Sequence, residues 1–153
     1  SSLVIYTGPM PPVEFWPMPP LGPIEVFPFP LPVEEPPVTY STGTVDLPQT
    51  WRVDLETGAI GGGAGADLWF RAVTASQRYL QPVGSARLAL GDGSNRGRDG
   101  CREAAFSTDR ISVNAGLVGR YICVRTNEGR TAQIRVNGLD GMILRLGYTT
   151  WAN

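Results

Sequence analysis

The sequence predicts an all-β fold, an antiparallel β-sandwich or barrel that carries an extended, proline-rich N-terminal arm. Residues 1–50 contain all but one of the 14 prolines, whereas residues 51–153 contain all but three of the 19 glycines. From Thr39 onward, short runs of β-branched and aromatic residues alternate with turn residues. The chain therefore divides into an arm, residues 1–44, and a globular all-β domain, residues 45–153.

The arm begins with a short strand-sized segment, residues 2–7, which Gly8-Pro9 ends. Its apolar residues are Leu3, Val4, Ile5 and Tyr6. Twelve prolines follow in residues 9–37, a density that excludes helix and central strand and favours polyproline II or extended chain. Apolar side chains fill the gaps between the prolines, the aromatic ones being Phe15, Trp16, Phe27 and Phe29. Because water-exposed linkers are polar, we expect these side chains to anchor the arm on a surface.

Eight candidate strands follow in the domain, each bounded by turn residues. They are 50–54, 67–73, 78–80, 86–90, 110–113, 119–125, 130–136 and 142–149. The last strands read as an antiparallel meander, with a three-residue loop at Asn127-Glu128-Gly129 and turn signals at Asn137-Gly138 and Asp140-Gly141. Residues 72–79 could form a single helical turn, and no longer helical periodicity is present.

The charge pattern excludes several kinds of chemistry. All 13 basic residues are arginines of residues 51–153, which carry nine acids, whereas residues 1–50 carry five acids and no base. Without His or Lys the chain has no Ser-His or Cys-His pair, no imidazole metal ligand, no Schiff base and no P-loop lysine. Arginine suits fixed contacts to carboxylates or sugars. A GC-rich genome or a thermophilic source would equally explain arginine in place of lysine.

Cys101 and Cys123 are too few for a zinc site, and we expect them to form a disulfide that pins a loop to a central strand. Two buried free thiols are the alternative. The chain begins at Ser1, and with a disulfide this suggests an extracellular or cell-surface protein whose signal peptide has been removed. No segment is long enough to span a membrane.

Two glycine-rich segments resemble ligand loops but depart from the patterns. Residues 58–66 lack the spacing and the lysine of a nucleotide loop, so we expect a flexible loop or close backbone packing. Residues 91–100 offer oxygen donors for calcium, but two arginines occupy the loop, so a solvated turn with internal Arg–Asp pairing is expected. The nine acids of residues 51–153 are compatible with a carboxylate pair for glycoside hydrolysis. No pocket signature in the sequence supports such a site.

The aromatic residues of the domain fall into two groups. The strand aromatics are expected in the core; they are Trp51, Trp69, Phe70, Tyr121 and Trp151. A sugar-stacking face could use Tyr79, Tyr148 or Trp151.

Residues 67–70, 121–130 and 146–151 together resemble a small all-β accessory module of exported multidomain bacterial proteins. The resemblance covers about residues 45–151, not the arm. It implies fold and location, and no activity.

These observations predict a non-catalytic structural subunit of an extracellular assembly, a filament, in which the arm and strand of one copy dock on the next copy. The alternative is an extracellular carbohydrate- or surface-binding module on a proline-rich spacer. We expect no cofactor, no metal and no nucleic-acid partner; the partners would be other copies of the chain or glycans. Whether the arm docks on its own domain or on a neighbour stays open.

Overall fold

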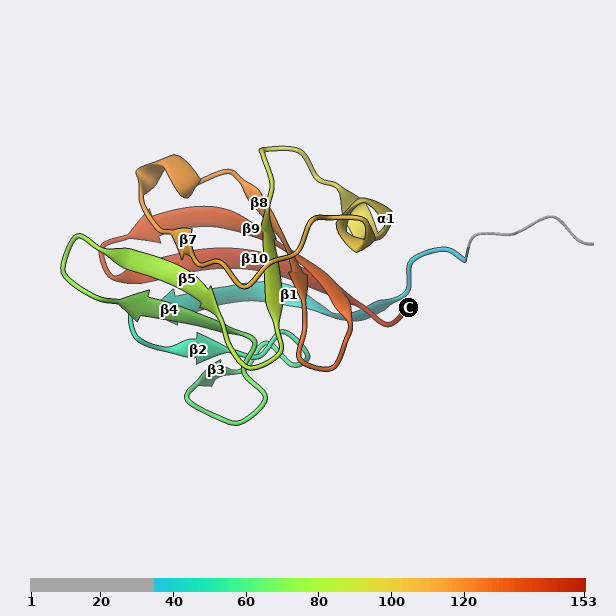
Figure 1. Cartoon of the computed structure of the whole chain (residues 1–153), viewed down its shortest axis with the longest axis horizontal. Coiled ribbons are helices and arrows are strands. Elements are labelled where there is room, and N and C mark those ends of the chain that lie inside the picture. The colour runs from blue at the N-terminus through green and yellow to red at the C-terminus, as the bar shows by residue number, and fades with distance from the viewer. Residues whose placement is uncertain (1–34) are drawn as a thin grey trace, which may run out of the picture. The chain divides into compact units, whose positions relative to one another are not determined.

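The computed structural model describes residues 35–153, in which two antiparallel β-sheets form a sandwich (Figure 1). Sheet A has the strand order β1-β10-β9-β8-β6, and sheet B has the order β3-β2-β4-β5-β7. The strands of sheet A are β1 (Thr39–Pro48), β6 (Arg87–Leu90), β8 (Tyr121–Arg125), β9 (Thr131–Asp140) and β10 (Ile143–Trp151). Those of sheet B are β2 (Arg52–Val53), β3 (Ile60–Gly61), β4 (Leu68–Ala72), β5 (Arg78–Pro82) and β7 (Ile111–Ser112). The predicted all-β sandwich is confirmed, whereas residues 1–34 of the predicted arm lie outside the described residues.

Two short helical segments accompany the sheets. They are the helix α1 (Gly97–Arg102) and the 3-10 turn η2 (Ala115–Leu117). No helix within residues 35–153 is long and apolar enough to cross a membrane.

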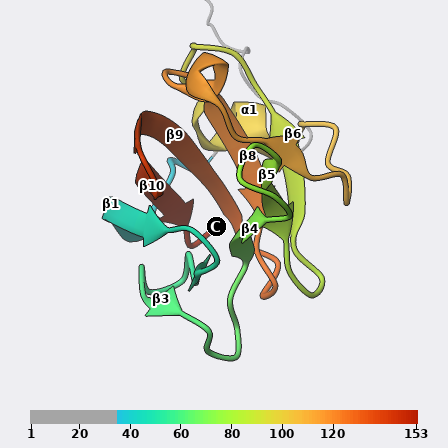
Figure 2. The ribbon, with the colours of Figure 1, turned by 90° about the vertical axis from the view of Figure 1, so that its left-hand side faces the viewer.

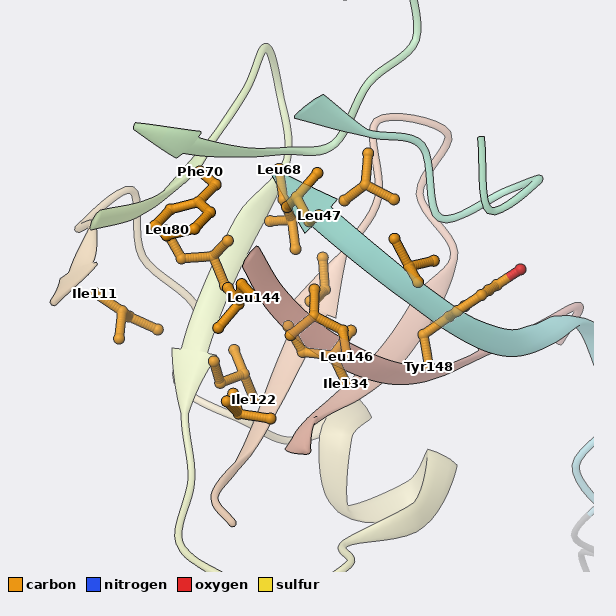
Figure 3. Close-up of a cluster of buried hydrophobic side chains, with 14 of the residues drawn as sticks. Leu47, Leu68, Phe70, Leu80, Ile111, Ile122, Ile134, Leu144, Leu146 and Tyr148 are labelled. Atoms are coloured by element: carbon orange, nitrogen blue, oxygen red, sulfur yellow. The ribbon is translucent and has the colours of Figure 1, made fainter. Parts of the chain in front are cut away.

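The core lies between the two sheets, because alternate residues of facing strands point into the same layer (Figure 3). Sheet A contributes Leu47 and Leu144, and sheet B contributes Phe70 and Leu80; all four side chains are fully buried. Burial of one such side chain contributes about 1.5–3 kcal/mol. One continuous apolar layer therefore holds the sandwich closed.

The chain changes sheet several times, as Figures 1 and 2 show: β1 belongs to sheet A, β2 to β5 to sheet B, β6 to sheet A, β7 to sheet B, and β8 to β10 to sheet A. At the first crossing the backbone N–H of Thr50 donates to the carbonyl of Phe70 at 2.6 Å. Thr50 has a φ of 77°. A β-branched side chain is strained in that left-handed region.

The predicted C-terminal meander is confirmed, and the turn of its second hairpin forms at one of the two predicted turn signals, Asp140-Gly141. Gly129 has a φ of 83° in the predicted three-residue loop between β8 and β9. The second turn lies at Gly141, with Asp140 paired to Ile143. Gly138 is instead a strand residue beside a register shift, because a bulge lets β9 continue through it.

Most of the expected strands are present, but four elements were not predicted: β1, β3, α1 and η2. The boundary predicted between residues 44 and 45 falls inside β1, which begins at Thr39. Residues 72–79, the predicted single turn, form the ends of β4 and β5 and the hairpin between them.

The core prediction for the strand aromatics was right for Phe70 and Trp151, which are buried, and wrong for Trp51, which is 45% exposed. Trp51 precedes β2 in the turn that contains Thr50, so the alternation of the strand does not extend back to it. Trp69 and Tyr121 lie in strands and are partly buried.

Candidate functional site

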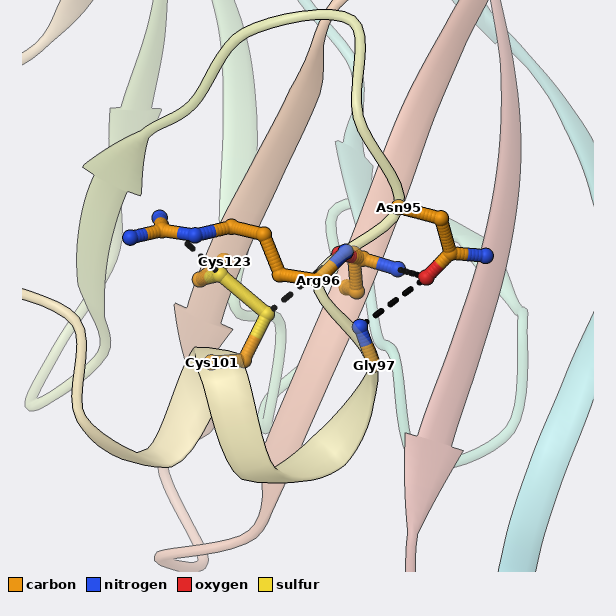
Figure 4. The surroundings of a disulfide bond; sticks show 6 residues. Asn95, Arg96, Gly97, Cys101 and Cys123 are labelled. Carbon is orange, nitrogen blue, oxygen red and sulfur yellow. Dashed lines mark hydrogen bonds between the residues drawn. A yellow bond between two sulfur atoms is a disulfide. The ribbon is translucent and has the colours of Figure 1, made fainter.

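The disulfide predicted between Cys101 and Cys123 is present and joins α1 to β8, with the two Cα atoms 5.2 Å apart (Figure 4). The alternative of two free thiols is therefore excluded. Both cysteines are buried on the outer face of sheet A together with Trp151 and Ala89. The bond thus holds α1 against the sheet on the side opposite the main core.

The loop that leads into α1 is built from side-chain hydrogen bonds rather than from an ion site. Asn95 Oδ1 accepts the backbone N–H of Gly97 at 2.9 Å and the side-chain amide of Gln133 at 2.8 Å. Gln133 Oε1 accepts the backbone N–H of Arg96 at 2.9 Å. Hydrogen bonds from Ser94 lower the pKa of Asp92. The oxygens of this loop are engaged in its own folding.

The expectation of a solvated turn over residues 91–100 was therefore wrong for its second half, which enters α1. The predicted Arg–Asp pairing is present: Arg98 lies 2.9 Å from Asp99, although the Arg98 side chain is buried. Burial against sheet A, which α1 contacts, replaces solvent around it.

A second candidate is the outer edge of β1. This ten-residue strand is the last of sheet A and pairs only with β10 among the strands in residues 35–153. Edge strands normally carry charges or proline that prevent pairing with another chain. β1 has a single charged residue, Asp46, and its one proline, Pro48, stands at its end. Its edge is therefore long and weakly protected.

A third candidate is the outer face of sheet B, where arginine and aromatic side chains stack. The guanidinium groups of Arg52 and Arg71 lie 4.8 Å and 5.1 Å from the ring centroid of Trp69. Arg110 lies 3.8 Å from the ring centroid of Tyr79. We call these five residues the Arg–aromatic face.

The arginines of this face are positioned but not neutralised. No ion pair within residues 35–153 involves Arg52, Arg71 or Arg110. Arg71 donates to Gln81 Oε1 at 3.2 Å, which together with the stacking fixes its orientation. A fixed guanidinium fork binds carboxylate or sulfate groups through paired hydrogen bonds. The face is thus suited to an anionic ligand.

A fourth candidate is a cluster of three carboxylates at the ends of β2 and β4. Asp54, Glu56 and Asp67 each place one carboxylate oxygen within 4.8 Å of the other two. Sequence reasoning missed this cluster. No local pattern reveals it, because Asp54 and Asp67 become neighbours only through the pairing of Val53 with Leu68, which they flank.

Asp67 is fully buried, and its oxygens accept three hydrogen bonds. Oδ2 accepts the backbone N–H of Leu55 at 2.8 Å, and Oδ1 accepts the backbone and side-chain N–H groups of Asn127 at 2.8 Å and 3.1 Å. Burial nevertheless dominates, and it raises the pKa of Asp67 to about 6.

Glu56 is buried beside an arginine. Arg130 Nη1 lies 2.6 Å from Glu56 Oε2 and 2.7 Å from the exposed Glu128. The guanidinium of Arg130 also stacks 3.8 Å from the ring centroid of Tyr40 in β1. The hydrogen bonds that Arg130 donates to both glutamates raise its pKa above the usual value, which keeps the cation in place between them.

A groove of about 550 Å³ opens between β6 and β7. Leu88, Ile111 and Leu117 form its apolar part, and Asp109, Arg110 and Arg120 line it as charged residues. Because the chain has no histidine or lysine, the groove offers contact area rather than a nucleophile with its usual base.

Several predicted site residues can be placed only in part. The arm residues lie outside the described residues; they are Leu3, Val4, Ile5, Tyr6, Phe15, Trp16, Phe27 and Phe29. Of the predicted sugar-stacking residues, Tyr148 and Trp151 are buried, so they form no open platform. Tyr79 belongs to the Arg–aromatic face, where Arg110 stacks on its ring.

The chain matches no protein-family model, no curated protein and no solved structure. The resemblance to bacterial accessory modules thus stays untested, and function has to be argued from the candidate sites themselves.

Proposed function

We propose that this chain is a non-catalytic structural subunit of an extracellular assembly, a filament, in which the arm of one copy docks on the next copy. The observation that carries the proposal is the outer edge of β1, which no other strand within residues 35–153 pairs with. Such an edge offers backbone N–H and C=O groups to an extended peptide, which joins the sheet as a further strand. Leu3–Thr7 has the length and composition of that strand.

The order of segments along the chain favours docking between copies. The arm leads into β1, so each copy would carry a donor strand, a connecting segment and an acceptor edge in sequence. As polyproline II at about 3.1 Å per residue, Pro9–Pro37 spans roughly 90 Å. A domain of about 100 residues has a radius of gyration near 13 Å. A donor strand on such a segment reaches a neighbour, and a head-to-tail contact that does not close propagates as a filament.

Charge supports the same arrangement. Residues 1–34 contain Glu14, Glu25 and Glu34 and no basic residue, whereas residues 51–153 contain 13 arginines against nine acids. Opposite net charges accelerate encounter and favour the productive orientation. The disulfide supports an oxidising compartment, which an extracellular location provides.

The experiment that tests this function compares the mass in solution of the full chain with that of a variant lacking residues 1–37, by light scattering and negative-stain microscopy. We expect filaments or large oligomers from the full chain and a folded monomer from the truncated one. Ile5→Asp should prevent assembly, because it places a charge in the donor strand. Ser1→Asp, which adds the same charge outside that strand, should assemble. Monomers of the full chain at all concentrations would refute the proposal.

The Arg–aromatic face favours a second function, the binding of anionic glycans. Guanidinium groups occupy positions over the rings of Trp69 and Tyr79, which disfavours stacking of neutral sugars and suits uronate or sulfate groups. Binding to an array of acidic and neutral polysaccharides tests this function. Arg71→Gln should abolish binding to acidic polysaccharides only, and the exposed Arg145→Gln serves as the matched control. Equal binding by both variants would count against this function.

A further inference from the structure

The three-carboxylate cluster has the spacing of ligands that share one ion. Two oxygens that bind the same calcium ion at about 2.4 Å can be no more than about 4.8 Å apart. One oxygen each of Asp54, Glu56 and Asp67 meets that limit, with all three within 4.8 Å of one another. The cluster is also shielded, since Glu56 and Asp67 are buried and Asp54 is partly buried.

An independent observation concerns the Glu56 carboxylate. Its side chain is 5% exposed, and Oε2 is paired with Arg130. The other oxygen, Oε1, is buried and has no hydrogen-bond partner within residues 35–153. A buried carboxylate oxygen without a partner loses its hydration and gains nothing in return. Glu56 Oε1 is therefore available to a ligand.

The local charge points to the same kind of ligand. Arg130 pairs with Glu56 and Glu128, and within residues 35–153 no ion pair involves Asp54 or Asp67. Three N–H groups donate to the two carboxylate oxygens of Asp67, which holds this side chain in a fixed orientation in the cluster. A second cation would compensate the remaining negative charge and satisfy Glu56 Oε1 at once.

We propose that Asp54, Glu56 and Asp67 bind a divalent cation, calcium, which joins the turn after β2 to the start of β4. The donor set selects a hard ion, because it consists of oxygens only. Zinc prefers nitrogen and sulfur, but the chain has no histidine and both cysteines form the disulfide. Three carboxylates on a fixed turn suit the affinity range of extracellular calcium modules, about 0.1–1 mM.

The ion would strengthen a junction that hydrogen bonds already define. Asp54 Oδ1 accepts the backbone N–H of Glu56 at 2.8 Å, which closes the turn. The turn is tied to β10, because Thr150 Oγ1 donates to the carbonyl of Leu55 at 2.6 Å. Calcium binding should thus raise the thermal stability of the whole domain rather than order a separate loop.

The test is calorimetric titration of the EDTA-treated full chain with calcium chloride, alongside thermal unfolding with calcium, with magnesium and with EDTA. We expect one ion per chain and a Tm that rises by several degrees in 10 mM calcium. Asp54→Asn and Glu56→Gln should each weaken calcium binding at least tenfold. Asp140→Asn removes an exposed carboxylate elsewhere and should bind like the unmodified chain.

Far-UV circular dichroism identifies a variant that folds poorly. In that case the calcium affinity of the other variant still tests the site. Binding of magnesium with equal or higher affinity would overturn the choice of calcium. Absence of stoichiometric binding to the folded chain, or unchanged affinity in both variants, would overturn the site itself. The oligomeric state plays no part in this readout, so the result is independent of the assembly proposal.

Discussion

Asn127 and Asp67 are 60 positions apart in the chain and are joined by two hydrogen bonds, from the backbone and the side-chain N–H groups of Asn127 to Asp67 Oδ1. The pair fixes the β8–β9 hairpin of sheet A to the start of β4 in sheet B. Asn127 also accepts the backbone N–H of Ser85 at 2.7 Å, so one side chain joins three separate segments.

Replacement of this side chain should therefore destabilise the domain more than its position in a surface hairpin suggests. For Asn127→Ala we expect a loss of about 2–4 kcal/mol in the free energy of unfolding, since buried partners lose their hydrogen bonds. Urea unfolding measures it, and Asn137→Ala, on an exposed position, should lose less than about 1 kcal/mol. Equal losses in the two variants would contradict the role of Asn127.

The raised pKa of Asp67 makes a prediction for the metal-free protein in EDTA. Because the folded-state pKa of about 6 exceeds the usual value of 3.8, the folded chain holds this proton more tightly than the unfolded chain. The contribution of Asp67 to the free energy of unfolding should be fully present below about pH 4 and decline as the pH rises to about 6, by up to about 3 kcal/mol. The difference between the chain and Asp67→Asn, measured by urea unfolding at several pH values, isolates this contribution. A difference that is constant with pH would be inconsistent with it.

Removal of the disulfide should weaken the domain without changing its fold, because the main core lies on the other side of sheet A. The double variant Cys101→Ala/Cys123→Ala should lose about 2–4 kcal/mol, as expected for a closed loop of this size. Guanidinium unfolding gives the difference, and far-UV circular dichroism should still show a β-rich domain. Unchanged stability would show that the bond adds nothing to the packing of α1.

A substitution at Thr50, where the backbone is strained, should stabilise the domain. Thr50→Gly removes the β-branched side chain at a φ of 77° and should raise the free energy of unfolding by about 1 kcal/mol. Thermal unfolding measures the gain. Thr57→Gly, in another turn, is the control and should not stabilise the chain, since it removes a side chain that accepts the N–H of Ala59. A destabilised Thr50→Gly would mean that side-chain contacts outweigh the strain.

Much of the sandwich followed from the sequence because its strands alternate clearly. In β8, Ile122 and Val124 face the core, and the three-residue loop at Gly129 fixes the next strand. β1 could not be predicted in this way, because Thr, Ser and Gly occupy five of its first six positions and only Val45 and Leu47 point inward. Its pairing with β10 joins residues about one hundred positions apart, as in Leu47 with Leu144, and no local pattern specifies such a contact.

The candidate sites likewise include one that the sequence predicted and others that it did not. The Cys101–Cys123 bond followed from composition alone, whereas α1 depends on contacts made by Asn95 and Gln133 that no helical pattern announces. The carboxylate cluster depends on the antiparallel pairing of β2 with β4, which brings Asp54 next to Asp67. Residues in turns gain their neighbours from the topology of the sheets, and local sequence patterns do not specify that topology.

Hydrogen–deuterium exchange of the β1 amides, measured on the full chain over a range of concentrations, tests arm exchange most directly. The account predicts that outward-facing amides of β1 are protected at high concentration and exchange quickly after dilution. In the variant that lacks residues 1–37 these amides should exchange quickly at every concentration. Protection independent of concentration would show that the arm docks within its own chain. Rapid exchange at all concentrations would show that the β1 edge stays free, and either result would contradict assembly by arm exchange.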